Sequence, residues 1–381
     1  MSNRQRKAAK RARRRHSTPP SARASNRVSP LLPDWLSAEL RDGSLGQLVE
    51  AEWRDAARHR DHVRAVEALA ALVAHPDVDE VLYVPELWSE LAERYRALGR
   101  FDAAVEAVWA ALDAGWNGAP DGRCDIARYL VQAGRPMQAD AVYAAVRVDT
   151  PEDTWLYNAA GIEWSVAHDP LRALTWLTEG IELAIAGADP NGIVAQMSEE
   201  RRRCLTALGS YLDDLEHRVD TFLESGNAAK RYRPGHRATK PDRIDRSLLA
   251  YPWIPAPAWQ DARRLWPHPA SDHVNYDAYR RSLQREFLNA SRCDRWTIRV
   301  APLEPGRYTS WCAEHGHHPE APTSPSHYAA DLARTGDGAT WPPAPGDPCW
   351  CGSHATYAEC CARVTAQPAE ATVDPPPILA S

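Results

Sequence analysis

The sequence predicts a mostly α-helical protein: a helical solenoid, then a small α+β module and a short cysteine-rich segment. Three observations lead to this fold class. A pattern of large and small apolar residues recurs at intervals of 35 and 34 residues within residues 85–187. A later stretch, rich in proline and tryptophan, mixes helical patterns with one strand pattern. Four cysteines, Cys349, Cys351, Cys360 and Cys361, lie within thirteen residues near the C-terminus.

The composition is that of a globular protein. With 381 residues, of which 44% are hydrophobic and 25% charged, the chain is long enough for a substantial core and more than one domain. No apolar run reaches the ~18 residues of a membrane helix, and no apolar segment follows the basic start as in a secretory signal. We expect a cytoplasmic protein without membrane contact. A sequence rich in Ala, Arg and Trp and poor in Lys is typical of a high-GC bacterial source.

The chain begins with a basic tail, residues 1–30, which we predict to be disordered. Residues 1–27 contain ten Lys or Arg and no acid, which leaves 35 basic against 51 acidic residues, a net charge of −16, for the rest. With no aromatic and almost no apolar residue, this segment cannot bury surface. Three interpretations stay open: a salt-sensitive contact with nucleic acid, a solubilising tail that rests on the acidic body, and a transit peptide, although an apolar face is missing.

The periodic region contains three similar units. The first, WSELAERYRALGRFDAAVEAVWAAL, places large, small, aromatic and turn residues at Trp88, Leu91, Ala92, Tyr95, Gly99, Phe101, Ala104, Val108 and Ala111. The second uses Ile126, Ala127, Leu130, Gly134, Ala139 and Tyr143, and the third Tyr157, Ala160, Gly161, Trp164, Ala173 and Leu177, with His168 at the turn. Small residues let two helices approach closely, while large ones fill the gaps. The region resembles the tetratricopeptide repeat family.

Flanking segments extend this helical-repeat domain to residues 31–226. Residues 45–75 have the pattern of one more helix pair, and residues 193–223 that of a closing helix with a possible bend. The resemblance implies a concave surface that binds a peptide or a protein partner. The alternative is that the repeats only hold the ends of the chain together.

A basic, turn-rich linker, residues 227–241, precedes the small α+β module, residues 242–345. Prolines exclude a helix in YPWIPAPAW, whereas residues 272–290 and 325–335 have helical patterns. WTIRVAP, residues 296–302, is the best strand candidate. The tryptophans of the module line a groove or form a small core; they are Trp253, Trp259, Trp266, Trp296, Trp311 and Trp341.

Other cysteines and histidines offer weaker signals. Cys312, His315, His317 and His318 are metal ligands by type, but histidines near a helix end are common without a metal. Cys124, Cys204 and Cys293 are scattered, and together with Cys312 they fit small buried hydrophobes in a reducing compartment.

The cysteine-rich segment, residues 346–363, has a C-x-C pair, eight further residues and two adjacent cysteines. Zinc prefers four thiolates in a tetrahedron, and two close pairs joined by a tight turn supply them. A redox site would more naturally be C-x-x-C, and a disulfide pair would need an oxidising compartment. Four protein thiolates leave zinc no open position, so catalysis at the metal is not expected.

These residues resemble the SEC-C motif, a short zinc-binding segment named after the C-terminus of the translocation motor SecA. The match comprises the four cysteines together with Gly352, Ser353 and Tyr357. The resemblance implies one structural zinc held by the four cysteines, with Tyr357 packed against the knuckle. The loop lacks the lysines of the motor protein, so docking to an acidic chaperone is not expected. Trp350 replaces the usual proline and is a candidate exposed contact. Residues 364–381 form a second disordered tail.

The sequence therefore favours a non-catalytic, zinc-binding adaptor whose repeats bind a protein partner and whose knuckle adds a second contact. The alternative is a nucleic-acid- or ribosome-associated factor that uses the basic tail. An enzyme is the least favoured class, because HExxH, GxSxG, C-x-x-C and a phosphate-binding glycine loop are all missing from the sequence.

Overall fold

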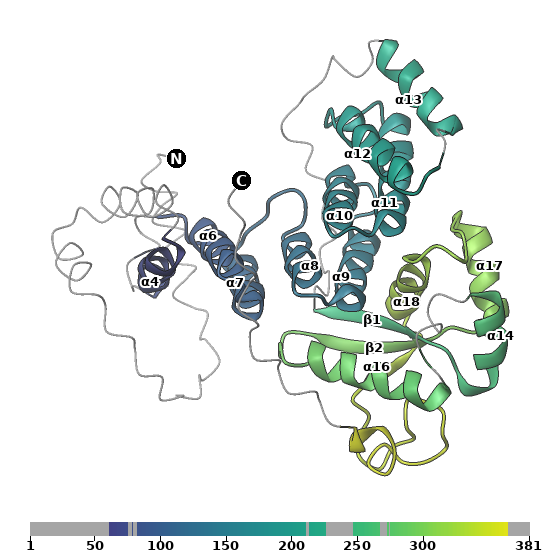
Figure 1. The fold of residues 1–381 in the computed structure, drawn as a ribbon. Coiled ribbons are helices and arrows are strands. Elements are labelled where there is room, and N and C mark those ends of the chain that lie inside the picture. Colours follow the sequence, from purple (N-terminus) through teal and green to yellow (C-terminus); the bar gives the residue numbers. More distant parts are fainter. Residues whose placement is uncertain are drawn as a thin grey trace, which may run out of the picture. The chain divides into compact units, whose positions relative to one another are not determined.

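The computed structural model describes residues 61–74, 78, 82–210, 213–225, 247–266, 273 and 275–364. All of them belong to one compact unit, residues 50–381. The expectations for residues 1–30, 45–60, 227–241 and 365–381 lie outside the described residues. The described part is mostly helical and contains one three-stranded sheet (Figure 1). None of its helices is both long and apolar enough to cross a membrane.

The periodic region folds as consecutive helix pairs. Helix α4 (His62–Val73) lies in the flanking segment before this region, whose own helices are α6 (Val84–Ala97), α7 (Phe101–Asp113), α8 (Arg123–Gln132), α9 (Pro136–Asp149), α10 (Thr154–Val166) and α11 (Pro170–Ala186). Each predicted unit supplies two helices that pack on one another: α6 on α7, α8 on α9, and α10 on α11. The small residues Ala104, Ala139 and Ala173 are fully buried. The small residues of the repeat pattern therefore mark the places where the two helices of each pair pack closely.

The turn inside each pair has the same backbone conformation. Gly99, Gly134 and His168 have φ angles of 68°, 70° and 61°, in the left-handed region. Glycine adopts this region without strain, whereas a side chain makes it costly. The third unit therefore has the turn geometry of the other two although histidine stands where they have glycine.

The predicted closing helix at residues 193–223 is wrong in one respect, because two helices form there. These are α12 (Val194–Ala207) and α13 (Asp214–Glu224). Gly209, with φ at 64°, lies between them and ends the first helix in a left-handed turn. The Arg201 guanidinium donates to Asp213 (3.0 Å) and Glu216 (2.8 Å), so buried charge links the two helices.

The C-terminal module is built on the sheet. Its strands are β1 (Leu248–Trp253), β2 (Thr297–Pro302) and β3 (Ala339–Trp341), in the order β1-β2-β3. β1 and β2 are parallel, with Leu249 opposite Ile298, and β2 and β3 are antiparallel, with Ile298 opposite Trp341. β2 confirms the strand prediction. β1 was missed because of its proline, Pro252, which an edge strand tolerates.

Four helices complete the module: α14 (Trp259–Leu265), α16 (Tyr276–Ala290), α17 (Pro305–His315) and α18 (Ser324–Arg334). Short 3-10 turns occur at η1 (Ala256–Ala258) and η2 (Cys361–Arg363). α16 packs through Phe287 against Tyr251 of β1 and Trp341 of β3. α18 packs on β1 and also on α9 of the repeat region (Figure 1). The module is therefore in direct contact with the helix pairs.

The six tryptophans of this module are all buried, so the core interpretation holds and the groove interpretation is wrong for these side chains. Cys124, Cys204 and Cys312 are also buried, as expected, whereas Cys293 is half-buried.

Candidate metal centre

A tight hairpin brings the two cysteine pairs together. The Cys349 amide donates to the Ala355 carbonyl (3.0 Å), and the Tyr357 amide donates to the Asp347 carbonyl (2.9 Å). Gly352 turns the chain with φ at 72°, and a Cβ there would lie 3.4 Å from the Trp253 ring. A side chain at this position would therefore meet both backbone strain and a neighbouring ring.

The four cysteine sulfur atoms converge. Their Sγ atoms all lie within 4.8 Å of one another. The Sγ of Cys351 lies 3.5 Å from that of Cys349 and 3.6 Å from that of Cys360, and all four thiols are free. Cys349, Cys351 and Cys361 are buried, and Cys360 is half-buried. The arrangement is a candidate metal centre.

The thiols influence one another's protonation. A hydrogen bond from Cys361 lowers the pKa of Cys351 to about 4, although burial acts in the opposite direction. The same hydrogen bond, together with burial, raises the pKa of Cys361. The four thiols therefore lie close enough to share protons, and a metal ion at this site would replace those protons.

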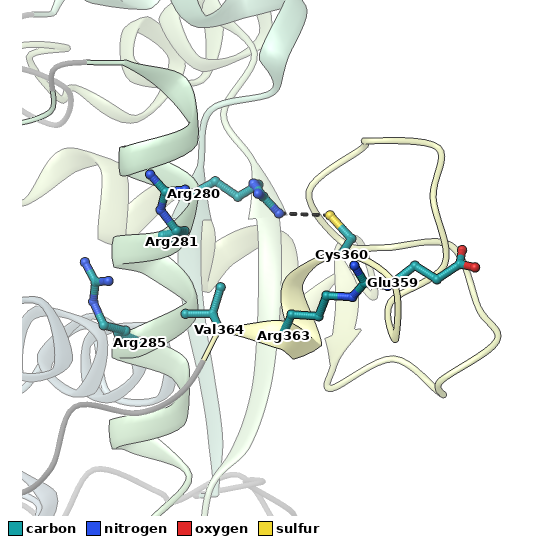
Figure 2. Close-up of a pocket in the computed structure, with 7 residues that line it drawn as sticks. All are labelled: Arg280, Arg281, Arg285, Glu359, Cys360, Arg363 and Val364. Carbon is teal, nitrogen blue, oxygen red and sulfur yellow. Dashed lines mark hydrogen bonds between the residues drawn. The ribbon is translucent and has the colours of Figure 1, made fainter.

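Side chains from outside the hairpin donate to the sulfur atoms. The Arg280 Nη1 atom of α16 lies 2.8 Å from the Cys360 Sγ (Figure 2). The same atom lies 3.2 Å from the Cys361 Sγ. The Ser353 hydroxyl donates to the Cys360 Sγ (3.2 Å). Burial lowers the pKa of Arg280, but hydrogen bonds to Asp277 and Cys361 outweigh it and raise the pKa. A fixed positive charge therefore faces the thiolates.

Gln284 of α16 joins the hairpin to the module core. Its side chain is fully buried, and its Oε1 accepts from the indole N–H of Trp350 (2.9 Å) and of Trp341 (3.1 Å). Its Nε2 donates to the Tyr357 hydroxyl (3.0 Å). Each polar atom of this buried amide thus has a partner, and two of its partners belong to the cysteine-rich segment.

Trp350 is buried, so the expectation of an exposed contact is wrong. Only 5% of its surface is accessible. Its ring packs edge-on against Trp253 and Phe287, with centroids 5.8 and 5.1 Å apart. Trp350 is buried because the cysteine-rich hairpin docks on the module through this side chain.

The weaker constellation of Cys312, His315, His317 and His318 does not come together as a metal site. His315 Nδ1 contacts the Trp311 carbonyl (2.9 Å), and His318 Nδ1 accepts from the Glu320 amide (3.3 Å). Only His317 joins a second cluster, with Glu179 of α11 and His327 of α18. The alternative left open by the sequence is wrong for the other three residues, because the helix end turns their side chains to different neighbours.

This second cluster already holds a cation, Arg147. Its Nε donates to Glu179 (3.1 Å) and its Nη2 faces His317 Nε2 (3.0 Å). Because arginine only donates, we assign His317 Nε2 as the acceptor, which leaves the proton on Nδ1, 3.4 Å from Glu179. Burial, with Arg147 adding to it, lowers the pKa of His327 well below its ordinary value. An ion pair between α9 and α11, not a metal, accounts for Glu179 and His317.

Two family models match the chain, both in its C-terminal part. Residues 258–342 match a domain of unknown function, DUF8829. Residues 347–363 match the SEC-C motif, which agrees with the resemblance drawn from the cysteines. Neither match covers the helix pairs, so neither bears on the resemblance to tetratricopeptide repeats. No curated protein and no solved structure matches the chain.

Sequence reasoning found the four cysteines and the turn residues but missed Tyr276, Arg280 and Gln284. The Tyr276 hydroxyl donates to the Cys351 carbonyl (3.1 Å). These three residues lie on one helix, more than sixty residues before the cysteines, and their helical pattern signals only an amphipathic helix. No sequence signal links them to the motif.

Proposed function

We propose that the protein is a non-catalytic zinc-binding interaction protein. The observation that carries the zinc assignment is the convergence of four thiols, with no other type of ligand in their cluster among the described residues. Two ligands about 2.3 Å from a tetrahedral zinc are about 3.8 Å apart. The Sγ separations of 3.5 and 3.6 Å around Cys351 fit that spacing. The residues present therefore fit one structural ion.

Bound zinc would supply folding free energy to the hairpin, which is too short for a core of its own. The protein's residues perform the remaining tasks. Cys349, Cys351, Cys360 and Cys361 hold the ion and leave no position for water or substrate. Arg280 offsets the negative charge of the thiolates and orients two of them, while Gln284 fixes the hairpin on α16.

We further propose that the helix pairs bind a protein partner, in the cytoplasm, as tetratricopeptide-like repeats do. The available surface excludes α9, because its consecutive residues Gln138–Val146 are all buried and lie on every face of the helix. α18 and β1 cover that helix. The partner surface is therefore sought on the other helix pairs, and the module itself acts as part of the scaffold.

Metal analysis of the full-length protein tests the zinc assignment. We expect one zinc per chain in the parent protein and none in Cys360→Ser. Cys293→Ser is the matched control, because Cys293 is a half-buried cysteine outside the cluster and its loss should leave the zinc content at one. A Cys360→Ser protein that retains one zinc per chain would contradict the assignment.

A pull-down with the same three proteins tests the adaptor role. We expect a defined protein partner that survives high salt with the parent protein and with Cys293→Ser. Its weaker recovery with Cys360→Ser would support a contact through the knuckle. Recovery of nucleic acid alone, lost at high salt, would instead favour the basic-tail alternative.

A further inference from the structure

A cavity of about 510 Å³ opens between α16 and the cysteine-rich hairpin (Figure 2). Its lining residues are Arg280, Arg281, Arg285, Glu359, Cys360, Arg363 and Val364. Three of the four arginines come from α16 and the fourth from η2. The cavity therefore exists only because the hairpin docks on this helix.

The positive charge in this cavity is only partly balanced. Asp277 pairs with both Arg280 and Arg281, and the Glu359 carboxylate accepts from the Thr356 hydroxyl (2.9 Å). Neither the Arg285 nor the Arg363 side chain has an ion pair or hydrogen bond within the described residues. Two guanidinium groups thus line the cavity with their donors available.

Asp277 stabilises Arg280 and Arg281. Placing Arg285 and Arg363 beside them gives the free protein no further ion pair in the part of the chain that the structure describes. Arg281 and Arg285 are four residues apart on α16, a spacing at which like charges destabilise a helix. Only Arg280 touches the cysteine sulfur atoms, so charge balance at the metal centre explains Arg280 but not the other three. A bound anion would relieve the repulsion between the clustered guanidinium groups, and this relief would add to the binding free energy.

The chemistry of the lining narrows the class of ligand. Guanidinium groups match phosphate oxygens with paired N–H donors, and a terminal phosphate has three oxygens and nearly two charges. None of the lining side chains is aromatic, so nothing here stacks on a nucleobase. Val364 is the single apolar lining residue, which disfavours an apolar peptide anchor.

We propose that this cavity binds the terminal phosphate groups of a small polyphosphate-bearing molecule, with Arg285 and Arg363 as its principal donors and Arg281 beside them. The ligand class is a pyrophosphate or the diphosphate end of a nucleotide. This site is distinct from the partner surface proposed for the helix pairs.

Calorimetric titration of the zinc-loaded, full-length protein with pyrophosphate tests the proposal. We expect one binding event per chain that weakens about tenfold or more in the double variant R285Q/R363Q. Arg264→Gln is the matched control, because Arg264 is an exposed arginine of the same module, paired with Asp261 and outside the cavity. The basic N-terminal tail is present in all three proteins, so its contribution cancels.

Three results would overturn the proposal. Equal pyrophosphate affinity in the parent and the double variant would show that the tail or another surface binds the anion. Loss of zinc from the double variant would show that these arginines serve the metal centre. The third result is a probe that binds more tightly than pyrophosphate and depends on the same arginines. If that probe is citrate, the site binds carboxylates; if it is an oligoribonucleotide with a 5′-hydroxyl end, the site binds a nucleic-acid backbone. A zinc content unchanged at one per chain, with weakened pyrophosphate binding, supports it.

Discussion

Replacing Gln284 with methionine should detach the cysteine-rich hairpin from the module. Methionine has nearly the length of glutamine but neither donates nor accepts a strong hydrogen bond. In Gln284→Met the indole N–H groups of Trp341 and Trp350 lose their shared acceptor, and the Tyr357 hydroxyl loses its donor. All three partners are buried, so water cannot replace the lost contacts.

The expected cost follows from these three contacts. A stranded buried donor costs roughly 1–3 kcal/mol, whereas burying a methionine side chain returns part of this through apolar contacts. Two stranded indole donors and one weakened phenol therefore lower the free energy of unfolding by roughly 2–4 kcal/mol. Surface substitutions usually change this free energy by less than about 0.5 kcal/mol.

Urea unfolding of zinc-loaded protein, followed by tryptophan fluorescence and by zinc release to a chelator, measures this change. Gln132→Met is the matched control, since Gln132 is exposed on α8 and makes one hydrogen bond, to Glu163 (2.9 Å). We expect zinc release at lower urea in Gln284→Met than in the parent. A stability and a release midpoint equal to those of the control would refute the anchoring role of this amide.

Three further predictions concern the metal centre, the ion-pair cluster and the helix packing. Arg280→Gln should speed zinc loss to a chelator by about tenfold relative to Arg281→Gln, because only Arg280 donates to the cysteine sulfur atoms; equal rates would contradict this. Burial lowers the pKa of His317 to about 4. Between about pH 6.5 and pH 4 the His317 imidazole is therefore neutral in the folded protein but takes up a proton in the unfolded chain. Stability should therefore fall from pH 6.5 towards pH 4, and H317F should flatten this fall; a parallel pH profile would count against it. Gly161→Ala should lower the free energy of unfolding by about 1–3 kcal/mol, since the added Cβ would lie 2.5 Å from a leucine side chain. Gly306→Ala, in open helical space, should change stability little or raise it, and equal effects would show that the helices repack freely.

The helix pairs could be predicted because the signal is local and repeated. Ala104, Ala139 and Ala173 occupy equivalent positions, and each is buried where two helices approach closely. His168 adopts the same left-handed turn as Gly99 and Gly134, so the third unit keeps the spacing of the other two without a glycine at the turn.

Other elements depend on context that periodicity does not carry. The prolines of YPWIPAPAW exclude a helix and gave no signal for a strand, yet the place of β1 at the sheet edge removes the penalty that a central strand would impose. The region after α11 has one continuous apolar pattern, but Gly209 adopts a left-handed conformation that ends α12, and a second helix follows. Tertiary placement therefore decided the outcome for β1, whereas a local turn residue decided it after α11.

The metal centre shows the same division on a smaller scale. Its four thiols come from one short segment, so their spacing alone predicted that they converge. The contacts that give them an electrostatic environment come from α16, 80 positions earlier for Arg280 and Cys360 and 66 for Gln284 and Trp350. The motif itself contains few basic residues, so its sequence predicts a hairpin with little positive charge. In the folded protein, however, the hairpin faces Arg280, Arg281 and Arg285. In a motif this short, the exposure of each side chain and the charge around the motif depend on the surface on which the motif docks. That surface therefore determines which ligand can bind beside the motif.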